Sequence, residues 1–62
     1  MNKFKLEITV KGRMYVEYFT SNLSGNELRD ALQYNTFFYI ERPDKITMYN
    51  TNSIDIINII QE

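Results

Sequence analysis

The chain contains neither cysteine nor histidine. Without cysteine it can form no disulfide and offers no thiolate ligand to a metal ion. Histidine is the commonest general base, and cysteine and histidine together supply the usual thiol nucleophile and metal ligands. The two absences therefore argue against an enzyme, and we expect no catalytic residue, no cofactor, no bound metal and no small-molecule substrate.

Long apolar runs and glycine-rich loops are also missing. No apolar stretch approaches the roughly 20 residues that a membrane-spanning helix needs, and no secretory signal pattern is present. We therefore expect a cytoplasmic protein that does not engage a membrane. The two glycines, Gly12 and Gly25, stand alone, so the sequence has no phosphate-binding loop.

Sixty-two residues make a single small domain over positions 1–62. A core of this size yields only modest stability, and no disulfide or metal site is there to reinforce it. The hydrophobic content of 44% is nevertheless that of a folded chain. We therefore expect a globular domain that self-associates, with a dimer as the favoured state.

Residues 23–33 carry the one convincing helix pattern. Ser24 and Glu27 have the spacing of a capping box, in which each side chain accepts a hydrogen bond from the backbone N–H of the other residue. The apolar residues that follow fall at i, i+3 and i+4: Leu28, Ala31 and Leu32. This spacing predicts a helix that packs one narrow apolar stripe on a sheet.

The chain before this helix predicts a hairpin. Residues 3–11 alternate between polar side chains and an apolar set consisting of Phe4, Leu6, Ile8 and Val10. Such alternation indicates a half-buried strand. Lys11-Gly12-Arg13 is the predicted turn, and residues 14–20 form the second strand. We expect Met14, Val16, Tyr18 and Thr20 to face the core, which leaves Tyr15 and Phe19 on the outer side.

The chain after the helix predicts three strands, at residues 37–42, 46–50 and 53–62, with a turn at Pro43 and Asp44 between the first two. The last segment is open to two interpretations. Ser53 suits a helix cap, whereas the five isoleucines suit a strand because their branched side chains restrict χ1. The isoleucines favour the strand.

These patterns predict an α+β fold of order β-β-α-β-β-β. The hairpin, the helix and a three-strand meander would form a small antiparallel sheet or a partly closed barrel, with the one helix packed on the sheet. The predicted core consists of Phe4, Leu6, Ile8, Val10, Val16, Leu28, Leu32, Phe38, Ile40, Ile46, Met48 and Ile56.

Aromatic residues indicate the kind of function. Five tyrosines and four phenylalanines are too many for one small core, and tyrosine is enriched at recognition surfaces. We therefore expect a small non-catalytic binding protein with a protein partner whose identity the sequence does not specify. The candidate contact residues are Tyr15, Phe19, Tyr39 and Tyr49.

Basic residues support a second hypothesis, nucleic-acid binding. Lys3, Lys5, Lys11 and Arg13 all lie in the first predicted hairpin, where they would neutralise phosphates beside exposed aromatic side chains. Against this, the net charge is −1 and Glu7 interrupts the row. Protein binding remains the first hypothesis.

The ending Ser53-Ile54-Asp55-Ile56-Ile57-Asn58-Ile59-Ile60 resembles the final strand of short proteins encoded by phages and mobile elements of low-GC Gram-positive bacteria. The frequent use of Asn, Ile, Lys and Tyr is similar too. The resemblance implies an accessory, regulatory or inhibitory protein that acts by binding, and it assigns no residue roles.

Overall fold

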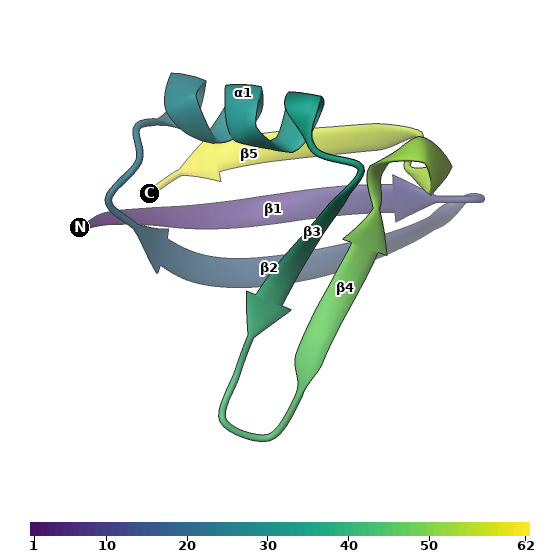
Figure 1. Cartoon of the computed structure of the whole chain (residues 1–62), viewed down its shortest axis with the longest axis horizontal. Helices are drawn as coiled ribbons and strands as arrows, with labels where there is room; N and C mark the ends of the chain where they lie inside the picture. The colour runs from purple at the N-terminus through teal and green to yellow at the C-terminus, as the bar shows by residue number, and fades with distance from the viewer.

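The computed structural model describes residues 1–62 and contains five strands and one α-helix (Figure 1). In chain order the elements are β1 (Asn2–Val10), β2 (Arg13–Ser21), α1 (Gly25–Tyr34), β3 (Phe37–Glu41), β4 (Ile46–Asn50), a 3₁₀ turn (Thr51–Ser53) and β5 (Ile56–Gln61). The predicted α+β class and the order β-β-α-β-β-β are confirmed. The final segment is a strand, as the isoleucines favoured.

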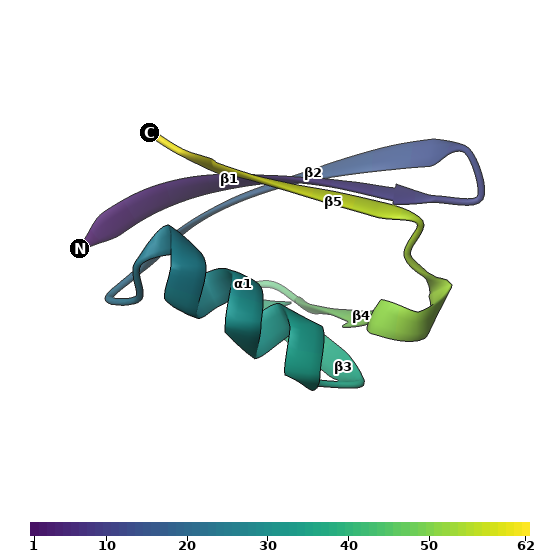
Figure 2. The ribbon, with the colours of Figure 1, turned by 90° about the horizontal axis from the view of Figure 1, so that it is seen from above.

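The elements form two layers. One layer is an antiparallel sheet of order β2-β1-β5, and the other contains α1 and the antiparallel β3–β4 hairpin (Figure 2). The hairpin crosses the sheet at an angle, and its turn projects beyond the β2 edge (Figure 1). The two sheets stay separate, and neither closes into a barrel.

The core lies between the layers and centres on β1. Phe4, Leu6 and Ile8 are at most 1% exposed, because β1 has a neighbouring strand on each side and the second layer above it. Leu28 and Leu32 of α1 complete this cluster. The alternating pattern of β1 and the apolar stripe of the helix therefore meet as predicted.

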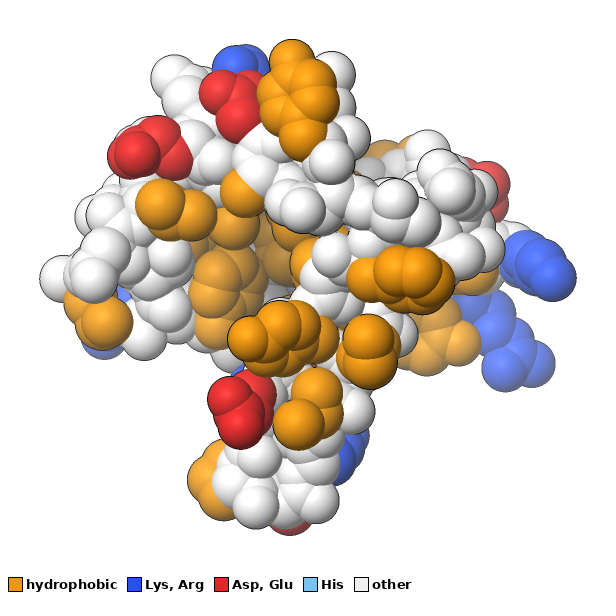
Figure 3. Space-filling model, viewed as in Figure 1, with side chains coloured by type: hydrophobic (Ala, Val, Ile, Leu, Met, Phe, Trp, Pro, Cys, Tyr) orange, Lys and Arg blue, Asp and Glu red, His pale blue; other side chains and the backbone are white.

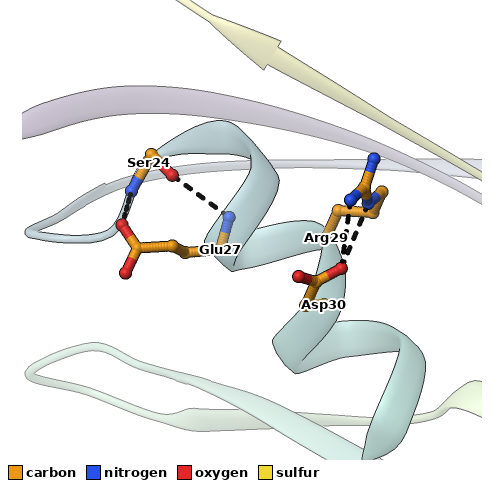
Figure 4. A network of polar contacts seen from close by, with 4 residues as sticks. All are labelled: Ser24, Glu27, Arg29 and Asp30. Atoms are coloured by element: carbon orange, nitrogen blue, oxygen red, sulfur yellow. Dashed lines mark hydrogen bonds and ion pairs between the residues drawn. The ribbon is translucent and has the colours of Figure 1, made fainter.

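The capping box of α1 is present as predicted (Figure 4). Ser24 Oγ accepts a hydrogen bond from the Glu27 N–H at 3.1 Å, and Glu27 Oε1 accepts one from the Ser24 N–H at 3.0 Å. Farther along the helix, Arg29 and Asp30 form an exposed ion pair at 3.2 Å. The cap satisfies backbone donors that the first helical turn would otherwise leave unpaired.

The inward face of β2 is the opposite of the predicted one. The turn holds two residues, Lys11 and Gly12, both with positive φ, so Arg13 lies opposite Val10. A turn of Lys11-Gly12-Arg13 would have placed Met14 there. Because side chains alternate along a strand, this one-residue difference reverses the faces of the whole strand. Phe19 consequently faces the core beside Phe4, and Val16 faces outward.

The partner of β5 also differs from the prediction. Instead of extending a meander from β4, β5 pairs antiparallel with β1, so that Ile59 lies opposite Leu6 and Ile57 lies opposite Ile8. The 3₁₀ turn at Thr51–Ser53 redirects the chain from the hairpin layer back to the sheet. This pairing places two isoleucines beside the most buried residues of the molecule.

The predicted core needs correction at four positions, which are exposed by 40% or more: Val16, Ile46, Met48 and Ile56. Partly buried residues pack on the core where these were expected, namely Phe19, Leu23, Tyr49, Ile54, Ile57 and Ile59. Every strand involved has apolar residues on both faces. Alternation alone therefore could not identify the inward face.

Candidate interaction surfaces

An apolar cleft of about 330 Å³ lies between α1 and β3. Eight of the eleven residues that line it are hydrophobic. They come from four elements and include Leu6, Phe19, Leu28, Leu32, Phe38 and Ile40. Figure 3 shows a hollow lined by hydrophobic side chains below the helix and beside the hairpin. The cleft thus opens the interior between the two layers to an outside group.

Local chain geometry explains why the cleft stays open. Asn35 and Thr36 connect α1 directly to β3, so the helix and the strand begin close together and then diverge (Figure 1). At the narrow end, the Thr51 N–H donates to the Thr36 carbonyl at 2.8 Å, and the Thr51 hydroxyl donates to the Asn35 carbonyl at 2.7 Å. No element fills the wide end of the wedge.

The β3 edge that faces away from β4 is unpaired. At the hairpin turn, Arg42 and Lys45 exchange both backbone hydrogen bonds, at 2.8 and 3.4 Å. Opposite residues along an antiparallel pair of strands alternate between hydrogen-bonded and non-hydrogen-bonded pairs. Because Arg42 and Lys45 form a hydrogen-bonded pair, the register makes Ile40 and Phe38 the β3 residues that hydrogen-bond to β4. Phe37, Tyr39 and Glu41 consequently direct their N–H and C=O groups to the open edge. Tyr39 and Glu41 also line the cleft.

The outward face of the β3–β4 hairpin is apolar as well. Tyr39 and Met48 lie directly opposite each other and are 64% and 65% exposed. Phe37 and Ile46 are also more than half exposed. The hairpin therefore carries apolar side chains on both sides although the core covers only one of them.

A polar cluster fastens this hairpin to the sheet. The Arg42 guanidinium lies 2.7 Å from Glu17 Oε1, and the Tyr49 hydroxyl donates to Glu17 Oε2 at 2.6 Å. Arg42 also donates to the Tyr18 carbonyl on the edge of β2, at 3.4 Å. Burial and then the hydrogen bond to Glu17 raise the pKa of Tyr49 well above its ordinary value. Glu17 thus holds β4 and the turn that follows β3 through ionic and hydrogen-bond contacts.

The outer face of the three-stranded sheet is uncovered. Its exposed apolar residues come from the two edge strands: Met14, Val16, Tyr18, Ile56 and Ile60. Between them, Lys5 and Glu7 of β1 form an ion pair at 3.7 Å. On this face, apolar side chains of the edge strands flank a charged central strand.

The four predicted aromatic contact residues lie in three different environments. Tyr39 is the most exposed of them, whereas Phe19 stacks on Phe4 at a ring separation of 5.7 Å. Tyr49 stacks on Phe38 at 5.1 Å and meets the edge of Tyr15 at 6.5 Å. Tyr15 is 44% exposed, and Tyr39, at 64%, is the one that lies on the outward face of the hairpin. Phe37 and Met48 on the same face were not among the predicted contact residues.

The four predicted basic contact residues do not form one surface. Lys3 and Lys5 lie on the outer face of the sheet, and Lys5 is paired with Glu7. Lys11 lies in the turn at the far end of β1, and the register places Arg13 on the opposite face from Lys3 and Lys5. A continuous track of phosphate contacts would need these charges on one side of the sheet.

The described residues contain no cluster of three or more acidic side chains suited to holding a metal ion. No helix has the length and apolar character required to cross a membrane. Comparison of the chain with protein-family models, with curated proteins and with solved structures gave no match.

Proposed function

We propose that this chain is a small non-catalytic binding protein that acts on another protein as a regulatory or inhibitory module. The observation that carries the proposal is the apolar cleft between α1 and β3, where Leu6 of the core lies at the floor and Tyr39 at the rim. Concave apolar surface with a few polar groups at its edge is typical of recognition sites. The proposed setting is the cytoplasm of a cell that carries a phage or mobile element.

The outward hairpin face supports the same proposal, because it continues the apolar surface beyond the cleft. Exposed apolar patches on small proteins mark interaction sites, and aromatic side chains contribute most to such interfaces. Phe37, Tyr39 and Met48 are the residues that we assign to partner contact. Of the predicted contact residues, Tyr15, Phe19 and Tyr49 would act by supporting this surface from beneath.

Affinity capture with matched variants tests the proposal. Tyr39→Ser and Tyr34→Ser each remove an exposed tyrosine, at 64% and 82% exposure, but only Tyr39 borders the cleft. In nuclease-treated lysate, wild-type protein and Tyr34→Ser should retain a discrete protein that Tyr39→Ser retains poorly. Recovery of nucleic acid alone, lost at moderate salt, would instead support the basic residues Lys3, Lys5, Lys11 and Arg13.

We also propose that the chain self-associates as a dimer through the outer face of the sheet. The support is the set of apolar side chains that nothing in the monomer covers, including Val16 and Tyr18. Val16→Lys should shift the sedimentation coefficient toward that of the monomer, whereas Met48→Lys, on the hairpin, should not. A wild-type chain that stays monomeric at high concentration would refute the dimer and leave partner binding unaffected.

A further inference from the structure

The apolar cleft lies between α1 and the unpaired edge of β3, whose backbone groups border it at Tyr39 and Glu41. We propose that it takes an extended segment of the partner protein, which adds to the free edge of β3. The segment would carry apolar side chains at alternate positions and basic side chains between them. This inference rests on the proposed function, because it names the part of the partner that binds.

The unpaired backbone groups of β3 are the first reason for proposing strand addition. Phe37, Tyr39 and Glu41 direct their N–H and C=O groups away from β4, and no strand of the molecule pairs with them. An open edge of this kind accepts an added strand through main-chain hydrogen bonds, whatever the sequence of that strand. The edge borders the cleft at Tyr39 and Glu41, so an added strand would lie over the apolar floor.

The alternate spacing follows from the pleat of the sheet. Phe38 and Ile40 point into the interior, whereas their neighbours in β3 point outward. Side chains of an added strand that lie level with Phe38 and Ile40 point the same way, at every second position. They would contact the apolar walls formed by Leu28 and Leu32 of the helix. The side chains between them would face solvent.

The charge at the rim of the cleft indicates which side chains the bound segment carries at its solvent-facing positions. Glu41 is the only charged residue that lines the cleft, and it forms no ion pair. On the helix, Glu27 lies one turn before Ala31, which lines the cleft, and it also forms no ion pair. Figure 3 shows acidic side chains on the same face as the hollow. Lysine or arginine at the solvent-facing positions would complement this rim.

The helix restricts the occupant to a single strand. Strands in a sheet lie about 4.8 Å apart, and α1 occupies the same layer as the hairpin on the far side of the cleft (Figure 2). A second copy that paired its own β3 edge here would bring its further strands onto α1. An extended segment without a neighbour on its other side fits, and a second copy of the chain does not.

A synthetic probe tests the inference directly. The probe is a blocked peptide of about seven residues that alternates lysine and leucine, and its control has the same composition with the leucines grouped together. Fluorescence anisotropy should show saturable binding of the alternating peptide, weaker at high salt, and little binding of the control. Equal binding of both peptides would mean non-specific attraction and would overturn the inference.

Matched protein variants locate the binding site. Ala31→Lys places a charge on the cleft wall and should weaken binding about tenfold or more. Gln33→Lys adds the same residue to the opposite flank of the helix, beside a more polar hollow, and should bind like wild type. Circular dichroism checks that both variants are folded. Equal loss of binding in both would refute the cleft as the site.

A second pair of variants tests the rim charge without touching the apolar wall. Glu41→Lys should weaken peptide binding about two- to fivefold, with a smaller salt dependence. Glu62→Lys makes the same charge change beyond the end of β5 and should have little effect. Equal effects would show that overall charge, not the cleft rim, attracts the peptide.

Backbone N-methylation distinguishes strand addition from simple apolar contact. Methyl groups on either the lysine amides or the leucine amides remove donors from one edge of the peptide. Only one of these two sets can face β3, so one methylated peptide should lose binding and the other should retain it. The sensitive set also reports whether the strand runs parallel or antiparallel to β3. Loss with both sets, or with neither, would overturn strand addition.

The two proposals fail in different ways. If no alternating peptide binds, but a folded partner is captured in a manner that Ala31→Lys abolishes, strand addition is refuted and the proposed function stands. If the peptide binds at the cleft but no protein is captured with any variant, strand addition stands and the proposed function loses its support.

Discussion

The two hairpins of this small domain are built in opposite ways, although each turns through two residues. The β1–β2 hairpin has nine-residue strands, and its β1 side chains include the most buried residues of the molecule. The β3–β4 hairpin has five-residue strands, and Ile40 is its only buried residue. The first hairpin therefore carries the stability of the fold, and the second presents apolar surface and an open edge to a partner.

This division has a physical basis in how each hairpin is covered. β1 lies between two strands and beneath the second layer, so its apolar side chains lose nearly all contact with water. The β3–β4 hairpin has no neighbouring strand on either side, and its contacts with the sheet are the inward side chains Phe38, Ile40 and Tyr49 and the polar cluster around Glu17. A hairpin with few buried contacts is the kind of element that opens first and adapts to a ligand.

The largest expected effect comes from shortening a core side chain. Ile8→Ala removes methyl groups from a residue with no exposed surface and should lower the free energy of unfolding by about 2–5 kcal/mol. Met48→Ala, on the outward hairpin face, should change it by about 0.5 kcal/mol or less. Urea denaturation measures both. Similar losses would mean that the two hairpins share the stability.

The next effect tests the attachment of the second hairpin. Glu17→Ala leaves Arg42 Nη2 and the Tyr49 hydroxyl without their acceptor and should lower the free energy of unfolding by about 1–3 kcal/mol. Hydrogen exchange should speed up at the amides of Phe38 and Ile40 more than in β1. Uniform acceleration would show that the hairpin does not open as a separate unit.

A smaller effect depends on pH through Tyr49. The folded state raises its pKa, so the neutral hydroxyl contributes stability in full below the unfolded value of about 10. That contribution falls as the pH rises from there toward the raised folded value. The stability of wild type relative to Tyr49→Phe should therefore decrease as the pH rises above about 10. A constant difference measured by urea denaturation would refute the coupling.

The smallest effect concerns the ion pair on the outer face. Lys5 and Glu7 are separated by 3.7 Å and remain partly solvated, so Lys5→Met should change the free energy of unfolding by about 1 kcal/mol or less. The pair between Arg42 and Glu17 is shorter and belongs to a larger cluster. A greater loss of stability from Lys5→Met than from Glu17→Ala would mean that the ion pair on the outer face stabilises the fold more than the cluster around Glu17.

Part of the candidate site could be predicted from the sequence. Tyr39 was correctly expected at the surface, because three consecutive aromatic residues at positions 37–39 cannot all point inward. The cleft could not be predicted from the sequence, because its lining comes from β1, β2, α1 and β3. No local pattern reports which residues of four separate elements converge, and nothing local shows that β3 has an unpaired edge.

The sequence by itself determined the features that depend on near neighbours along the chain. These are the alternation of β1 and the capping box of Ser24 and Glu27. Each arises from interactions among residues a few positions apart.

Only the tertiary structure decided the pairing of β5 with β1 and the opening between α1 and β3. The inward face of β2 depended on whether the turn holds two residues or three, a difference that reverses every side chain of the strand. Strands with apolar residues on both faces can pack either way. The choice is made by the total apolar surface that the assembled layers bury, which is a property of the whole chain.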